Sequence, residues 1–179
     1  MLLKKMFKRP RPCDFLMNLT ELGTVKIGTP RDFTNFMNAV IDKSAFDSIV
    51  GYINYAKTSP DAEILSGGSY DDETGYFIEP TTILTSDPHF KTMEEEIFGP
   101  GLTIFLYEPS DWEQTIELVD STSPYALTGC VMGSNEAAIE QAKNRLIHSA
   151  GNFYINDKPT GAVVGQQPFG GSRASGTND

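Results

Sequence analysis

The sequence predicts an α/β fold with a mainly parallel sheet flanked by helices. Between residues 102 and 155, short apolar runs alternate with segments of helical periodicity, in the order strand, helix, strand, helix, strand. The connections are short, and this order implies parallel strands joined by right-handed crossovers. Hydrophobic residues make up 39% of the 179 residues, which is enough for a sizeable core. No apolar run approaches the roughly 18–20 residues that a membrane span needs.

The charge is uneven along the chain. The formal net charge is −10, but residues 1–13 hold five basic residues and no acid, so the remainder carries −15. An acidic body disfavours nucleic acid and anionic membranes as partners. Residues 1–24 also show weak periodicity, and we expect a weakly structured basic segment there. It is either an organelle-targeting segment or a solvated terminus.

Two helices are expected in the first half. Thr29 is a favourable cap, Pro30 suits the first helical position, and Asp32 is an acid in the first turn. The apolar stripe that follows consists of Phe33, Phe36, Met37, Val40 and Ile41. A second helix is expected over residues 45–56, with an apolar face made of Phe46, Ile49, Val50 and Ile53.

Three extended segments are expected around and after these helices. Residues 63–66 predict a short strand that stops at Gly67-Gly68. Residues 76–84 predict an edge strand or an extended loop, because Pro80 cannot donate a ladder hydrogen bond. Residues 102–107 form a short apolar run, as expected of a strand that is buried on both faces.

The second half alternates between helices and strands. Ser110 and Glu113 have the spacing of a capping box, which predicts a helix with Trp112, Ile116 and Val119 on its apolar stripe. Residues 127–132 predict a strand, and Ser134 is expected to cap the next helix. That helix presents an apolar face made of Ala138, Ile139, Ala142 and Leu146. Residues 151–155 predict a third strand. The glycine-rich residues 156–179 then leave its carboxyl end, where open α/β sheets place their sites.

Residue type and spacing alone point to few candidate catalytic or metal-binding residues. Cys13 and Cys130 are the two cysteines, and neither has the spacing of a metal site or a disulfide framework. A reducing compartment is therefore the simpler assumption. Cys130 lies mid-strand and is expected to be a small core residue, and nothing predicts an ordered pocket around Cys13. His89 and His148 are far apart, so we assign no metal ligand.

Two features stay open from the residues alone. The acids Glu94–Glu96 are either a solvated charge run or include one carboxylate that accepts hydrogen bonds from ligand hydroxyls. Phe98 is then placed to pack against a flat ring. In the glycine-rich tail, Phe169 is either a core residue or a pocket wall, and free backbone N–H groups offer a site for an anion.

Five segments together resemble the NAD(P)-dependent aldehyde dehydrogenases, in order and in spacing. They are GYFIEPT at 75–81, EEIFGP at 95–100, YALTG at 125–129, GNFYIN at 151–156 and PFGG at 168–171. The run NDKPTGAVVGQQPFGG at 156–171 resembles one branch of that family, which oxidises glutamate semialdehyde, the open form of pyrroline-5-carboxylate. The similarity covers about residues 20–179. It implies an aldehyde dehydrogenase catalytic-domain-like fold over residues 25–179, present as a partial domain.

The resemblance assigns roles to individual residues. It implies that Glu96 binds the ribose of the nicotinamide and that Phe98 lies beside that ribose and ring, with NAD as the cofactor of the complete enzyme. It implies that backbone N–H groups at Gly161 and Ala162 receive the α-carboxylate of the substrate. Some relatives have Ser at the position of Ala162, so a side-chain hydrogen bond is absent here. Phe169 is implied to pack on the aliphatic stem of the aldehyde.

The departures from the family pattern limit what the chain is expected to do. The family's nucleophile lies in a Gly-Gln-x-Cys-type motif upstream of the region that begins at Val25, and this sequence holds no such motif. We therefore assign no catalytic residue. The resemblance predicts a C-terminal fragment of a proline-catabolising dehydrogenase that is inactive alone. The alternative is a non-catalytic protein that pairs with full-length subunits.

The expected partners and location follow from the same resemblance. The complete enzyme is expected to take a small-molecule aldehyde and to form a homo-oligomer. The basic first residues favour the mitochondrial matrix as the location, and the cytoplasm is the alternative.

Overall fold

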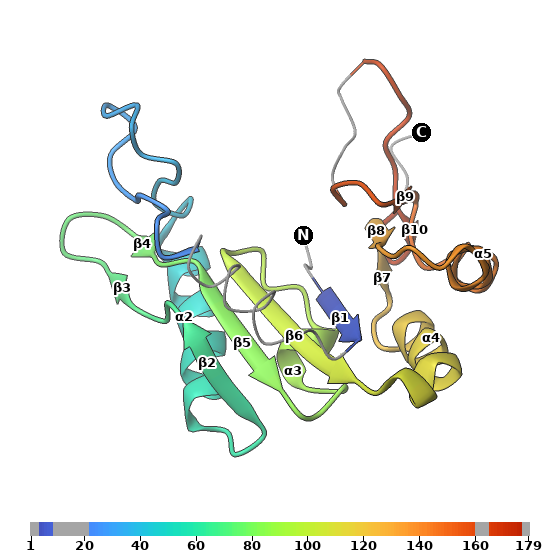
Figure 1. The fold of residues 1–179 in the computed structure, drawn as a ribbon. Coiled ribbons are helices and arrows are strands. Elements are labelled where there is room, and N and C mark those ends of the chain that lie inside the picture. The colour runs from blue at the N-terminus through green and yellow to red at the C-terminus, as the bar shows by residue number, and fades with distance from the viewer. Residues whose placement is uncertain (1–3, 9–21, 160–164, 177–179) are drawn as a thin grey trace. The chain divides into compact units, whose positions relative to one another are not determined.

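The computed structural model describes residues 4–8, 22–159 and 165–176. The chain divides into two compact units, Met1–Pro109 and Ser110–Asp179, where one partial domain over residues 25–179 was expected. Each unit has its own sheet and helices (Figure 1). Mixed helices and sheets confirm the predicted α/β class.

A four-stranded sheet forms the centre of the first unit. In sheet order its strands are β1 (Lys4–Lys8), β6 (Gly101–Tyr107), β5 (Thr81–Thr85) and β2 (Ala62–Ser66). The pairs β1–β6 and β6–β5 are parallel, and only β2 runs antiparallel to its neighbour β5 (Figure 1). The sheet is therefore mainly parallel, as predicted. The short strands β3 (Tyr70–Asp71) and β4 (Phe77–Ile78) form a separate antiparallel pair.

Two of these strands differ from the expectation. β5 is a central strand rather than an edge strand, because Pro80 precedes its first residue and so removes no hydrogen bond from the ladder. β1 lies in the basic start, where weak structure was expected. Its five residues, KKMFK, are too few to show a clear alternation, so pattern alone does not reveal the strand.

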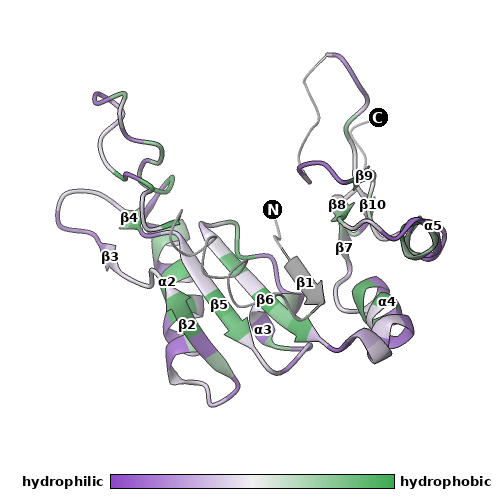
Figure 2. Ribbon diagram, in the orientation of Figure 1, coloured by the Kyte–Doolittle hydropathy of each residue, from purple (hydrophilic) through white to green (hydrophobic). Residues whose placement is uncertain are grey.

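Helix α2 (Lys43–Thr58) confirms the second predicted helix. The side chain of Asp42 caps it by accepting a hydrogen bond from the backbone N–H of Ala45. Its buried face, made of Phe46, Ile49, Ile53 and Ala56, packs into two core clusters that also include Ile78 and Ile83. The short helix α3 (Lys91–Glu94) adds Met93 to the second cluster. The apolar residues appear as green bands along α2, β5 and β6 in Figure 2.

The predicted helix over residues 29–41 is wrong. Its backbone N–H groups turn back toward Lys26 instead: those of Phe36 and Met37 both donate to the Lys26 carbonyl, at 2.9 and 3.1 Å. Asp32 further stabilises a turn by accepting a hydrogen bond from the N–H of Thr34. Most of the supposed apolar stripe is exposed: Phe33, Phe36 and Ile41 lie in solvent, and only Met37 and Val40 are partly buried. Without burial of that stripe, tertiary packing does not stabilise a helix.

The second unit contains helices α4 (Trp112–Ser121) and α5 (Glu136–Arg145), preceded by the 3-10 turn η1 (Pro109–Asp111). Strands β8 (Thr128–Val131) and β9 (Asn152–Ile155) pair in parallel, and β7 (Tyr125–Ala126) pairs antiparallel with β10 (Ser172–Arg173). The core cluster of Ile116, Ala142 and Leu146 joins the two helices and confirms both predicted stripes. Among the described strands, β6 pairs with β1 and β5, so it is not the partner of β8.

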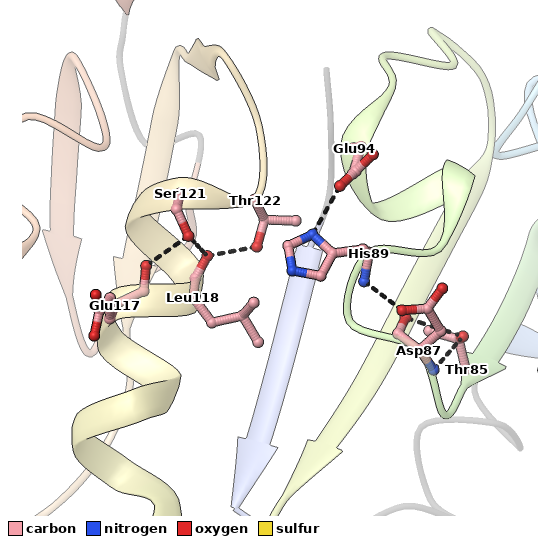
Figure 3. Close-up of polar contacts among 8 residues, drawn as sticks. All are labelled: Thr85, Asp87, His89, Glu94, Glu117, Leu118, Ser121 and Thr122. Carbon is pink, nitrogen blue, oxygen red and sulfur yellow. Dashed lines mark hydrogen bonds and ion pairs between the residues drawn. The ribbon is translucent and has the colours of Figure 1, made fainter.

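The predicted helix caps are both off by one residue. Ser110 lies in η1, and Asp111 is the residue that precedes α4. Asn135, not Ser134, caps α5 by accepting a hydrogen bond from the N–H of Ala138. At the other end of α4, Thr122 donates from Oγ1 and from its backbone N–H to the Leu118 carbonyl (Figure 3).

Within the described ranges, no helix is both long enough and apolar enough to cross a membrane.

Candidate functional site

The candidate cofactor residues lie on the turn between α3 and β6. Glu95 directly follows α3 as its C-terminal cap, and its backbone N–H donates to the carbonyl of Lys91. The chain then continues to Pro100, whose carbonyl accepts a 2.8 Å hydrogen bond from the N–H of Thr81 in β5. We call residues 95–100 the EEIFGP turn. It stands at the start of a central parallel strand and is tied to the neighbouring strand.

The three consecutive acids have three different surroundings. Glu94 pairs with His89, with 2.8 Å between Oε1 and the ring Nδ1 (Figure 3). Glu95 accepts a 2.5 Å hydrogen bond from the hydroxyl of Tyr52 in α2. Glu96 is exposed. Glu95 is exposed as well, so position distinguishes Glu96: it lies on the turn between the Glu95 anchor and Phe98.

Phe98 adopts an unusual backbone conformation. Its φ is 57°, in the left-handed region, and its side chain is 77% exposed. For a residue other than glycine, that conformation costs about 1–3 kcal/mol and persists only where the surroundings impose it. A large aromatic ring is therefore held in solvent, two residues from the Glu96 carboxylate. This arrangement fits a ligand that offers both hydroxyl groups and a flat ring.

The substrate residues predicted from the sequence lie in the second unit. Gly161 and Ala162 fall outside the described residues. Phe169 is 39% exposed and follows Pro168, whose carbonyl accepts a 3.1 Å hydrogen bond from the side-chain amide of Asn152. The Oδ1 of the same amide accepts a hydrogen bond from the N–H of Gly170. Asn152 in β9 thus holds the backbone on both sides of Phe169.

The start of the glycine-rich segment is held in the same way. Asn156, with φ at 52°, pairs through its side-chain amide with both backbone groups of Gly133: Oδ1 accepts at 2.8 Å and Nδ2 donates at 3.0 Å. Beside it, the thiol of Cys130 donates to the carbonyl of Asp157, with 2.8 Å between the two heavy atoms. Cys130 lies in β8, which confirms the predicted position in a strand, but it is only half-buried and is therefore not the core residue that was expected. The amides of Asn152 and Asn156 are positioning groups that sequence reasoning did not single out.

The Asp120 carboxylate joins β10 to α4. It accepts a hydrogen bond from the hydroxyl of Ser149, and Arg173 lies 2.5 Å away through Nη2. The hydrogen bond from Ser149, followed by the hydrogen bond and the positive charge of Arg173, lowers the pKa of Asp120 below its usual value. Because Arg173 lies shortly after Phe169, this ion pair fixes the far end of the glycine-rich segment.

A cavity of about 550 Å³ lies elsewhere in the first unit, and no sequence signal pointed to it. It is lined mainly by residues of the 27–29 loop and the β3–β4 pair, including Ile27, Tyr70, Asp71 and Phe77. None of the predicted site residues lines it. In the part of the chain that the structure describes, no group of three or more acidic, histidine or cysteine side chains is arranged to hold a metal ion.

Comparisons with known proteins cover nearly the whole chain. Residues 13–179 match the model of the aldehyde dehydrogenase family. The chain is 60% identical over 161 residues to the mitochondrial delta-1-pyrroline-5-carboxylate dehydrogenase of Dictyostelium discoideum, a match that covers 90% of this chain and 29% of that protein. It is 48% identical over 162 residues to the mitochondrial enzyme of the same name in Homo sapiens, again covering 90% of this chain and 29% of the relative.

Solved structures give the same result. The delta-pyrroline-5-carboxylate dehydrogenase from Mycobacterium tuberculosis bound with NAD matches with a TM-score of 0.85 and 41% identity, over 98% of this chain and 32% of that one. A betaine aldehyde dehydrogenase from Staphylococcus aureus in complex with NAD+ matches with a TM-score of 0.82 and 28% identity, over 97% and 34%. The chain thus spans about a third or less of the relatives and structures it matches.

Proposed function

Because the chain belongs to the aldehyde dehydrogenase family, we propose that it supplies the C-terminal part of the catalytic domain of an NAD-dependent enzyme. The proposed substrate is L-glutamate γ-semialdehyde, the open form of pyrroline-5-carboxylate, and the product is glutamate. The proposed role of the complete enzyme is in proline catabolism. The identity to pyrroline-5-carboxylate dehydrogenases supports that choice of substrate. The names of the same relatives support a mitochondrial location.

The EEIFGP turn carries the proposal. Glu96 accepts hydrogen bonds from the ribose hydroxyls next to the nicotinamide, because an ionised carboxylate is an acceptor and a diol is a donor. Phe98 presents its exposed ring to the same part of the cofactor. When bound, NAD accepts the hydride from the substrate. The strained φ of Phe98 is the single observation that most favours a binding role, since such strain concentrates at functional sites.

The glycine-rich segment is the proposed substrate contact. Backbone N–H groups at Gly161 and Ala162 donate to the α-carboxylate of the semialdehyde, and Phe169 packs on its aliphatic stem. The paired amides of Asn152 and Asn156 support this role, because they fix the backbone before and after the loop. Backbone that is held in place before binding lowers the entropy cost of binding a ligand.

We further propose that the 179-residue chain is inactive alone. It spans 29% of the Dictyostelium relative, and the described Cys130 lies within β8, where its thiol donates a hydrogen bond to the backbone carbonyl of Asp157. The test has two arms. The pure chain is incubated with NAD and glutamate semialdehyde, and a chimera is assayed in which the chain replaces the matching segment of the Dictyostelium relative. Activity in the chimera alone supports the proposal, and NADH production by the pure chain would falsify its inactivity.

Residues of the first unit favour a second candidate, a non-catalytic protein that pairs with full-length dehydrogenase subunits. Phe33, Phe36 and Ile41 are 97%, 82% and 93% exposed, which is unusual for large apolar side chains in one loop. Size-exclusion chromatography of the chain mixed with the full-length Dictyostelium relative tests this. Co-elution that is lost in a Phe33→Ser, Phe36→Ser variant supports pairing through this loop, and separate elution rejects it.

A further inference from the structure

We propose that Tyr52 is a positioning residue for cofactor binding and acts through Glu95. This inference rests on the proposed function, because it assumes that Glu96 and Phe98 contact the cofactor. Tyr52 lies in α2, a helix that contains none of the five family-like segments. Its hydroxyl donates to Glu95 Oε2 at 2.5 Å, across 43 positions of sequence.

A cation completes this contact. The Nζ of Lys91 lies 5.0 Å from the centre of the Tyr52 ring and 3.9 Å from Glu95 Oε2. Lys91 thus meets both the ring face and the carboxylate, so phenol, ammonium and carboxylate form one cluster. A hydrogen bond to an ionised acceptor is shorter and stronger than one between neutral groups. The cluster therefore fixes the side chain of Glu95, the residue directly before Glu96.

The same helix also supports the other end of the turn. Ile49 lies one helical turn before Tyr52 and is 2% exposed, and the backbone of Gly99 packs directly on its side chain. The two support points, Glu95 and Gly99, bracket the two proposed cofactor residues. The position of Glu96 and Phe98 is consequently set by α2, whose buried face is anchored in the core.

The inference predicts a selective kinetic effect. In the chimera described above, Tyr52→Phe should raise the KM for NAD about fivefold, a factor typical of one lost hydrogen bond. The KM for the aldehyde should stay within about twofold, because that substrate binds at the other segment. Glu95→Gln keeps a hydrogen-bond acceptor for Tyr52, so its KM for NAD should lie between those of the unmodified chimera and of Tyr52→Phe. A merely structural role would lower the melting temperature or the active fraction without raising the KM for NAD alone.

The chain offers a matched control one turn along α2. Tyr55→Phe also removes a phenol hydroxyl, but that hydroxyl makes no hydrogen bond among the described residues, and the ring beside Lys91 remains. The control should leave both KM values unchanged. An equal change in Tyr52→Phe and Tyr55→Phe, or no change of the KM for NAD in Tyr52→Phe, overturns the inference.

A second measurement does not need activity. In the 179-residue chain, the exchange rate of the Glu95 amide hydrogen is measured. This N–H donates a 3.0 Å hydrogen bond to the carbonyl of Lys91. Tyr52→Phe should speed exchange at this amide several-fold more than Tyr55→Phe does. If the chimera fails while exchange responds as expected, the proposed function fails and the contact stands. If the chimera is active and Glu96→Gln weakens NAD binding, but neither exchange nor KM responds to Tyr52→Phe, the role of Tyr52 is rejected.

Discussion

A Cβ atom at Gly99 would lie 2.6 Å from Cδ1 and 2.8 Å from Cγ1 of Ile49. Both distances are shorter than real Cβ contacts, and Ile49 is buried in the core. The backbone of the EEIFGP turn therefore rests directly on α2, at a distance that only glycine permits. This contact fixes the distance between α2 and the turn that holds the exposed Glu96 and Phe98.

The first prediction concerns this contact. Gly99→Ala should lower the free energy of unfolding by about 1–3 kcal/mol, because the branched side chain of Ile49 cannot move aside without disturbing the core. Denaturant unfolding measures the change. The control is Gly51→Ala in the middle of α2, where an added Cβ meets nothing within 4 Å. It should stabilise the chain by about 0.5–1 kcal/mol, so equal effects of the two substitutions would contradict the contact.

The second prediction separates stability from binding at Phe98. Phe98→Gly should leave the stability of the chain unchanged or raise it by about 1 kcal/mol, because glycine adopts the observed φ of 57° without strain. The same change should weaken NAD binding by the chimera, since the ring is lost. Phe98→Leu removes the ring but keeps the strain, so it should weaken binding without the gain in stability. Thermal melts and NAD titrations of both variants provide the check.

The third prediction concerns acid stability and Asp120. Its folded-state pKa lies below the usual value of 3.8, with the hydrogen bond from Ser149 as the largest cause. The contribution to stability is therefore fully present above pH 3.8 and is lost as the pH falls through the folded-state pKa. Because 43% of the side chain is exposed, Asp120→Asn should cost only about 1 kcal/mol at pH 7.

The measurement is a series of thermal melts from neutral to strongly acidic pH. The difference between the wild-type chain and Asp120→Asn should shrink toward zero at the acid end. Ser149→Ala should flatten the acid dependence more than Arg173→Gln, since the Ser149 hydrogen bond has the larger influence on the pKa. A constant difference at every pH would show that the Asp120 charge plays no part.

The fourth prediction concerns two threonines of the central sheet. Thr82 is 1% exposed, and its hydroxyl has no hydrogen-bond partner among the residues the structure describes. Thr82→Val should therefore stabilise the chain by about 1 kcal/mol, because a methyl group replaces an unsatisfied buried hydroxyl. Thr103, equally buried, donates to Thr92 at 2.7 Å, so Thr103→Val should destabilise it by a similar amount. Denaturant unfolding that gives both variants the same sign would reject this assignment.

Local patterns predicted the regular elements well where burial and sequence agree. The spacing of Phe46, Ile49 and Ile53 predicted α2, and all three are buried. The spacing of residues 33–41 is just as helical, yet Phe33 and Ile41 are almost fully exposed. Periodicity alone does not show whether another part of the protein covers the apolar stripe. In this segment the backbone forms hydrogen bonds to Lys26 instead of a helix.

The residues of the candidate site were predicted from the family resemblance, because residue types and spacing alone left their roles open. The letters of the EEIFGP motif separated Glu96 from its two neighbours, but they carry no information about distant contacts. The partner of Glu95 is 43 positions away, and that of Glu94 is a histidine with no metal spacing. The positive φ of Phe98 is equally invisible, because nothing in the residue type predicts it. Only the structure shows the partner of Glu95, the partner of Glu94 and the φ of Phe98.

The most direct test of the account is NAD binding by the chimera in two single variants, measured by calorimetry. The central claim is that the three consecutive acids have separate roles and that only Glu96 contacts the cofactor. Glu96→Gln should raise the Kd for NAD about tenfold, as expected for the loss of charged hydrogen bonds. Glu94→Gln weakens the surface pair with His89 and should change the Kd less than about twofold. An unchanged Kd in Glu96→Gln, or equal changes in both variants, would contradict the claim.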